Sequence, residues 1–133
     1  MENKIKKVLV VEDDNDLRNI LVDGLNVSNY QVFQAGDGEQ AVAMLVDQKP
    51  DLVLLDLLLP KLDGFKVLER LRKYPDKSIS ETKVIVLSNL WSDKDLLRAQ
   101  ALKIDEYYVK ANANLDEVFG KIHTILTAPS GIK

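Results

Sequence analysis

The sequence predicts an α/β domain in which a parallel β-sheet is covered by helices on both faces. Five short apolar runs alternate along the chain with stretches that have the periodicity of amphipathic helices. Three of the five runs are apolar at nearly every position, as strands buried on both faces are. The length of 133 residues suits one hydrophobic core, so we expect a single domain.

The five apolar runs have the length and the Val, Leu and Ile content of β-strands. The first, third and fourth are almost entirely apolar, which favours central positions in the sheet, whereas the second and fifth are more polar, which favours its edges. We predict strands at Lys7–Val11, Gln31–Ala35, Leu52–Leu55, Val84–Leu87 and Tyr107–Val109.

Between these runs, apolar residues recur at three- or four-residue spacing, which predicts five amphipathic helices. Residues typical of helix starts precede several of them. Arg72 and Lys73 are interpreted as a solvated helix end. The apolar stripes include Leu17, Leu21 and Leu25; Ala41 and Leu45; Phe65, Leu68 and Leu71; Leu97 and Ala101; and Val118, Ile122 and Leu126. The start signals are Ser92 with Asp95, Asn114 with Glu117, Gly36-Asp37-Gly38 and Asp63-Gly64.

Five successive βα units imply right-handed crossovers within one parallel sheet. The number of strands favours the flavodoxin-like, doubly wound order 2-1-3-4-5 with five helices. We expect this domain to span residues 1–128. Residues 129–133 contain Ser and Gly and are expected to form a flexible C-terminal tail.

The composition excludes several classes of protein. With 46% hydrophobic and 29% charged residues, the chain is too apolar for a disordered segment and too charged for a membrane span. The net charge of −3 makes it a poor partner for polyanions, so we expect no direct nucleic-acid binding and no membrane association. The chain has no cysteine, which excludes disulfides and thiolate metal sites, and no signal-peptide core, so we expect a cytoplasmic protein.

Acidic side chains follow two strands that the predicted order makes neighbours. Glu12 and Asp13 come directly after the first strand, and Asp56 comes directly after the third. In such sheets, ligands bind beyond the carboxyl ends of the strands, where the strand order reverses. Ser88 ends the fourth strand and Lys110 follows the fifth, so both should lie on the same edge.

Carboxylates gathered in one crevice repel one another, at about 4 kcal/mol for two charges 4 Å apart in a dielectric near 20. Lys110 supplies one compensating charge, and a hard divalent cation would supply two. Oxygen ligands favour Mg²⁺ over zinc. A carboxylate can attack phosphorus in line while Mg²⁺, Lys110 and Ser88 share the charge of the phosphoryl oxygens, which is most of what phosphoryl transfer needs.

These motifs resemble the receiver family of bacterial two-component response regulators, from about Lys6 to Leu126. The resemblance implies that Asp56 is the phosphoacceptor and that Asp13 binds Mg²⁺ directly. It also implies that Glu12 acts on the ion through water and that the backbone carbonyl of Leu58 is a further ligand. The motifs are Val8–Asp14, Pro50–Gly64, Val84–Ser88 and Tyr107–Lys110.

The same resemblance implies a conformational switch. Ser88 would turn toward the phosphoryl group, Lys110 would salt-bridge it, and Tyr107 would swing inward. Together they would remodel the face formed by the fourth helix, fifth strand and fifth helix. The implied donor is a sensor histidine kinase or a histidine phosphotransfer protein, the downstream protein target is unknown, and the implied state is a monomer or a phosphorylation-dependent dimer. Such a switch catalyses only its own phosphorylation and dephosphorylation.

The sequence departs from the family pattern at several positions. Ala111 replaces the usual Pro after the lysine. Because a cis bond before a non-Pro residue costs roughly 2.5–4 kcal/mol, we expect a trans bond and an altered loop around Lys110. Asn89 replaces a small residue and would narrow access to the site. Leu58 and Leu90 are apolar where many relatives have polar residues.

Two other functions stay open. A pseudo-receiver would bind partners without being phosphorylated, which Asn89 and Ala111 favour. A phosphatase of the haloacid dehalogenase type also forms an aspartyl phosphate, but it requires a second Asp where this chain has Leu58. Taken alone, Ser88 is typical of a turn hydroxyl, Lys110 of a solvated lysine and Asp14 of a helix cap.

Overall fold

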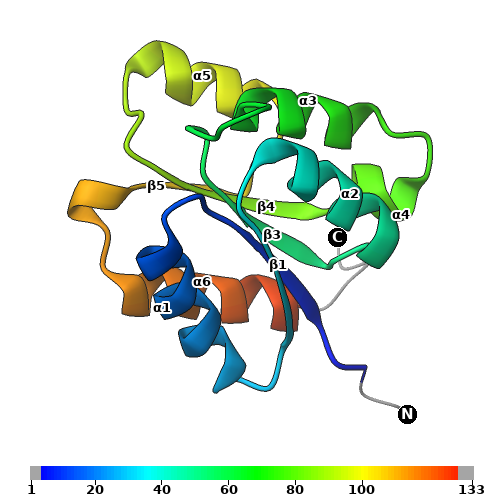
Figure 1. Cartoon of the computed structure of the whole chain (residues 1–133), viewed down its shortest axis with the longest axis vertical. Helices are drawn as coiled ribbons and strands as arrows, with labels where there is room; N and C mark the ends of the chain where they lie inside the picture. Colours follow the sequence, from blue (N-terminus) through cyan, green and yellow to red (C-terminus); the bar gives the residue numbers. More distant parts are fainter. Residues whose placement is uncertain (1–3, 129–133) are drawn as a thin grey trace.

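The predicted sheet is present in the structure, a computed structural model that describes residues 4–128 (Figure 1). Its five parallel strands follow the order β2-β1-β3-β4-β5, which confirms the predicted topology with the polar strands at the edges. Residues 129–133, predicted to be a flexible tail, lie outside the described residues. The strands are β1 (Lys7–Val11), β2 (Gln31–Ala35), β3 (Leu52–Leu55), β4 (Lys83–Ser88) and β5 (Glu106–Val109).

The described residues form six α-helices and one 3₁₀ helix, rather than the five helices predicted. The two additional elements are the single turn α4 and the 3₁₀ helix η1. Both are too short to show a helical period in the sequence, and α4 depends on a local cap from the Asp76 side chain. The helices are α1 (Asn15–Asn26), α2 (Gly38–Gln48), α3 (Gly64–Lys73), α4 (Lys77–Ser80), α5 (Asp93–Ala101), η1 (Lys110–Asn112) and α6 (Leu115–Thr127).

The helices form two layers, with α1 and α6 on one face of the sheet and α2, α3 and α5 on the other (Figure 1). Alternate residues of β1 face opposite layers, because side chains of a strand point alternately to its two faces. Leu9 and Val11 join the core under α2 and α3, whereas Val8 and Val10 join the core under α1 and α6. The central strands are thus buried on both faces, and full burial of each such side chain contributes about 1.5–3 kcal/mol.

Five helices follow a strand along the chain after a short connection, and each begins with a side-chain cap. The side chains of Asp14, Asp37, Asp63, Ser92 and Asn114 accept hydrogen bonds from backbone N–H groups in the first turns of α1, α2, α3, α5 and α6. A cap of this kind contributes about 1 kcal/mol. The predicted start signals are therefore confirmed, and the helix N-termini lie at the carboxyl edge of the sheet.

Arg72 is not the solvated helix end that the sequence suggested. Its guanidinium donates hydrogen bonds of 2.7–2.9 Å to the backbone carbonyls of Ser80, Thr82, Leu102 and Lys103. Burial lowers its pKa. Arg72 thereby ties α3 to the segments that enter β4 and β5, at the edge of the sheet opposite the acidic residues.

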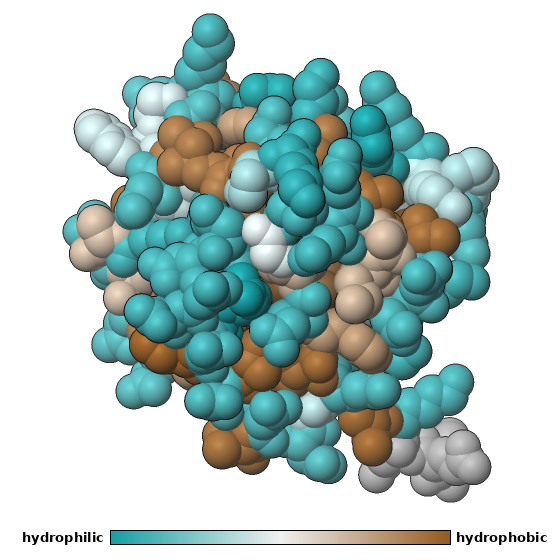
Figure 2. Space-filling view, in the orientation of Figure 1, coloured by the Kyte–Doolittle hydropathy of each residue, from teal (hydrophilic) through white to brown (hydrophobic). Residues whose placement is uncertain are grey.

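The surface seen in Figure 2 is mostly hydrophilic, with smaller apolar areas between the charged residues. Leu58, Trp91 and Leu97 are among the large apolar side chains that are at least half exposed. Within residues 4–128, none of the helices has the length and apolar character needed to cross a membrane.

Candidate functional site

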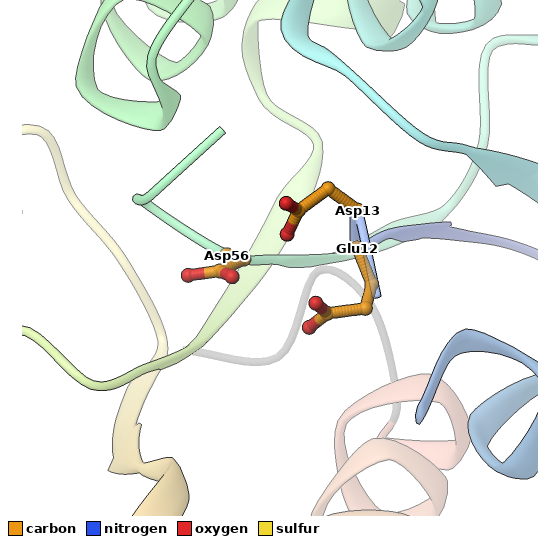
Figure 3. Close-up of side chains that lie close together, drawn as sticks. All are labelled: Glu12, Asp13 and Asp56. Carbon is orange, nitrogen blue, oxygen red and sulfur yellow. The ribbon is translucent and has the colours of Figure 1, made fainter. Parts of the chain in front are cut away.

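Three carboxylates that follow neighbouring strands meet at the carboxyl edge of the sheet. Strands β1 and β3 pair in parallel with Val11 opposite Leu55, so the residues that follow them emerge side by side. Glu12 and Asp13 come from β1, and Asp56 comes from β3 (Figure 3). One carboxylate oxygen of each lies within 4.8 Å of those of the other two. Glu12 and Asp56 are buried, whereas Asp13 is exposed, so the cluster opens to solvent on the Asp13 side.

Lys110 lies against the two buried acids. Its Nζ is 2.7 Å from Oδ2 of Asp56 and 2.8 Å from Oε1 of Glu12. The Lys110 side chain is 18% exposed, compared with 2% for each carboxylate. Burial alone would lower the pKa of Lys110, but its hydrogen bonds to the two acids outweigh burial and raise that pKa. Burial raises the pKa of Glu12, and the bond from Lys110 offsets part of the rise.

Backbone groups hold the remaining oxygen of each of the two buried carboxylates. The Asp14 N–H donates to Oε2 of Glu12 (3.0 Å), and the Leu58 N–H donates to Oδ1 of Asp56 (3.1 Å). Arg18 donates to the backbone carbonyl of Glu12 at 2.7 Å, which anchors the end of β1 to helix α1. Three carboxylates within reach of one ion, all with oxygen donors, form a ligand set that fits Mg²⁺.

Comparison with known proteins agrees with this geometry. Residues 8–122 match the family described as "Response regulator receiver domain". This chain belongs to that family. It is a receiver domain of two-component signalling, and its fold superposes on that of a solved receiver domain.

The receiver has relatives in several organisms. It is 39% identical over 110 residues to a "Probable transcriptional regulator ycf27" of Cyanophora paradoxa. The matched region covers 83% of this chain and 44% of that protein. It is 32% identical over 120 residues to the "DNA-binding dual master transcriptional regulator RpaA" of Synechocystis, covering 90% of this chain and 48% of RpaA. The receiver domain of Francisella response regulator 1452 superposes with a TM-score of 0.80 at 27% identity, covering 90% of this chain and 95% of that one.

These relatives correct one expectation. The sequence of this receiver predicted no direct nucleic-acid binding, and that prediction is wrong, because RpaA is named as a DNA-binding regulator. The prediction used the net charge of −3. Net charge describes these 133 residues alone, and the chain spans about half the length of the relatives it matches. Charge balance in a receiver therefore carries no information about the rest of such regulators.

The other predicted site residues of the receiver lie around the loop that joins β4 to α5. Ser88, at the end of β4, is completely buried, and its Oγ accepts a hydrogen bond of 3.4 Å from the Leu90 N–H. The half-buried Tyr107 donates from its hydroxyl to the Leu90 carbonyl. Burial raises the pKa of Tyr107. Ser88 and Tyr107 thus both bind the backbone of Leu90, at its N–H and its carbonyl.

The departures of the receiver from its family pattern also lie at this edge. The Lys110–Ala111 bond is trans, as expected, since no peptide bond between residues 4 and 128 is cis. The Leu58 side chain is 50% exposed. Asn89, which the sequence suggested would narrow access, accepts a hydrogen bond of 3.1 Å from the Ala111 N–H at its Oδ1.

Three features of the site were not found from the sequence: the Arg18 anchor, the bond between Asn89 and Ala111, and the close packing of Gly38. A Cβ built on Gly38 would lie 1.8 Å from the Leu62 carbonyl oxygen, so α2 and the loop after β3 fit together only because this residue has no side chain. The Gly36-Asp37-Gly38 sequence signalled a turn, but the contact with residue 62 is not visible in a local pattern.

Proposed function

We propose that this receiver takes a phosphoryl group on Asp56 from a phosphohistidine donor, in a reaction that depends on Mg²⁺. The observation that carries the proposal is the position of the Asp56 carboxylate. It lies within metal-sharing distance of Glu12 and Asp13, while Lys110 binds its Oδ2. A nucleophile, a metal-ligand set and a cation at one sheet edge are the parts that phosphoryl transfer to a carboxylate requires.

Each residue is assigned a role. Asp13 and Asp56 would hold Mg²⁺ directly, the backbone carbonyl of Leu58 would be a further ligand, and Glu12 would act through a bound water. When bound, the ion supplies positive charge for the phosphoryl oxygens. The exposure of Asp13 supports this assignment, because an ion that keeps several waters needs an open side.

In the transfer step, a carboxylate oxygen of Asp56 attacks the phosphorus. The new P–O bond forms as the P–N bond to the donor imidazole breaks, and the electron pair of that bond stays on the leaving nitrogen. Lys110 moves its hydrogen bond from Oδ2 of Asp56 to a phosphoryl oxygen, and Ser88 donates its hydroxyl to another. Moving the Ser88 hydroxyl would alter its bond to the Leu90 N–H, and Tyr107 would follow through the Leu90 carbonyl. The surface of α5, β5 and α6 would change as a result.

Phosphorylation by a small donor tests the proposal. Incubation with acetyl phosphate and Mg²⁺, followed by intact mass measurement, is expected to add one phosphate to the wild type and none to Asp56→Asn. Asp47→Asn, an exposed acid on α2, is the control and should still take the phosphate. A wild type that never gains mass would favour the pseudo-receiver, and turnover of a phosphomonoester would favour the phosphatase.

Mg²⁺ is expected to raise the melting temperature, because it relieves the repulsion among the three carboxylates. The stabilisation should approach about 2.7 kcal/mol when free Mg²⁺ is roughly 100 times its dissociation constant. Asp13→Asn should lose most of this shift in thermal melts, whereas Asp47→Asn should keep it. An equal Mg²⁺ shift in Asp13→Asn and the wild type would rule out the assigned ligand set.

The output of the switch is proposed from the relatives. Both the ycf27 protein and RpaA are named as transcriptional regulators, which supports a role of this receiver in controlling transcription through a downstream partner. Residues 1–128 are proposed as the folded unit, and the implied donor is a sensor histidine kinase or a phosphotransfer protein.

A further inference from the structure

Two loops meet where the pairing of the last two strands ends. Strands β4 and β5 pair in parallel, and the last pair in register is Ser88 with Val109. Just beyond it, the Ala111 N–H donates a hydrogen bond of 3.1 Å to Oδ1 of Asn89. A side-chain hydrogen bond therefore continues the connection between the two segments after the backbone ladder has stopped. We refer to this bond between Asn89 and Ala111 as the clasp.

The clasp is formed by two of the residues in which this chain departs from the family pattern, Asn89 and Ala111. Proline has no backbone N–H, so a proline at position 111 could not donate the bond. A small apolar residue at position 89 would offer no acceptor. Asn89 and Ala111 are thus the acceptor and donor of one interaction. In sequence they are 22 residues apart, and only the folded chain relates them.

The clasp lies next to the residue that carries the positive charge of the site. Lys110 is the first residue of η1, whose turn is closed by a hydrogen bond from the Ala113 N–H to the Lys110 carbonyl. The N–H that donates to Asn89 belongs to the peptide group that joins Lys110 to Ala111. Holding this peptide group fixes the position of the Lys110 backbone, from which the side chain extends. Nζ of Lys110 then lies 2.7 Å from Asp56 and 2.8 Å from Glu12.

We propose that Asn89 is a positioning residue for Lys110: the clasp holds the loop after β5 so that the ammonium group meets the phosphoryl acceptor. The inference rests on the proposed function of Asp56. Asn89 need not touch the phosphoryl group. It limits the placements of Lys110 to those that stabilise charge in the transfer step, because catalytic groups lose effectiveness when their supporting contacts loosen.

Loss of the clasp should lower the rate of phosphorylation by the equivalent of one hydrogen bond. Asn89→Ala should slow phosphorylation by acetyl phosphate about twofold to tenfold, the rate equivalent of a typical net hydrogen bond. The dissociation constant for Mg²⁺, measured by calorimetry, should stay unchanged, because Asp13 and Asp56 keep their places. Asn112→Ala, an exposed asparagine truncated in the same loop, is the matched control and should react at the wild-type rate.

A double-mutant cycle separates positioning from a general effect on the fold. If Asn89 acts through Lys110, Asn89→Ala should slow the wild type but cause no further slowing in Lys110→Ala. Should Lys110→Ala react too slowly to measure, a second cycle pairs Asn89→Ala with Ala111→Pro, which removes the donor. The double variant should then be no slower than Ala111→Pro alone.

The outcomes separate a failure of the clasp from a failure of the proposed phosphorylation of Asp56. A wild type that takes no phosphate would overturn both. A wild type that reacts, with Asn89→Ala as fast as Asn112→Ala, would overturn the clasp alone. Additive slowing in the measured cycle would also overturn it, since Asn89 would then act independently of Lys110 or of Ala111.

Discussion

Replacing Lys110 with alanine is expected to lower the free energy of unfolding by about 3 kcal/mol in Mg²⁺-free buffer. Lys110 binds Asp56 and Glu12, and the two carboxylates are almost completely buried. Without the ammonium group, two adjacent buried carboxylates would lose their common counter-charge. Removing one partner from a buried ion pair is costly for this reason. The loss corresponds to a drop of roughly 10 °C in melting temperature for a domain of this size.

The matched control is another lysine that forms an ion pair on the surface. Nζ of Lys121 lies 3.5 Å from Oε1 of Glu106, and both side chains are 39% exposed. Lys121→Ala should therefore cost less than about 1 kcal/mol in urea or thermal unfolding. Mg²⁺ should raise the free energy of unfolding more in Lys110→Ala than in the wild type, because the ion replaces the missing charge. Equal losses in the two lysine variants would show that burial does not strengthen the Lys110 contacts.

Gly38→Ala is expected to destabilise the domain by about 3 kcal/mol, the upper part of the range for overpacking. The new Cβ would overlap the Leu62 carbonyl oxygen at 1.8 Å and would also meet Cβ of Leu62 at 2.6 Å. Backbone atoms cannot rotate away as a flexible side chain can. The Gly38 N–H also donates to the Pro60 carbonyl at 3.3 Å, so the clash would separate α2 from the loop after β3.

Gly120 provides the control for the substitution itself. It lies inside α6, and a Cβ added there would meet no atom within 4 Å. Gly120→Ala should stabilise the domain by up to about 1 kcal/mol, because alanine is the better helix former. Chemical denaturation of both variants measures the contrast. Because the loop contacted by Gly38 contains Leu58, Gly38→Ala should also weaken Mg²⁺ binding. A Gly38→Ala variant as stable as the wild type would mean that the loop shifts without cost.

The secondary structure was predictable because local patterns determine it. The runs predicted as the first three strands coincide with β1, β2 and β3. β4 extends beyond the predicted run at both ends, to Lys83 and Ser88, and β5 begins one residue earlier, at Glu106. These three residues are polar, so hydrophobicity did not mark them. Backbone groups form the strand ladder whatever the side chain, so pairing continues past the apolar run.

The sequence predicted that the site residues gather at one edge of the sheet, but not how they contact one another. Asp13 and Asp56 are 43 positions apart in the sequence. The strand order inferred from five βα units places both at the switch point, because parallel strands bring their carboxyl ends to one edge. The roles assigned to these residues came from the family resemblance rather than from the strand order. Individual contacts, such as the Leu58 N–H to Asp56, were not predictable, because they depend on how loops of fixed length close.

Patterns in the sequence were enough to predict the five strands, apart from a few end residues, the five longer helices, the order of the strands and the edge where the charged residues gather. All of these follow from periodicity and from the chirality of βα crossovers. Three contacts became visible only in the folded chain: Lys110 bridges both buried acids, Asn89 accepts from Ala111, and Gly38 lies against Leu62. These contacts join residues far apart in the chain through distances of a few ångströms, and no local pattern encodes such distances.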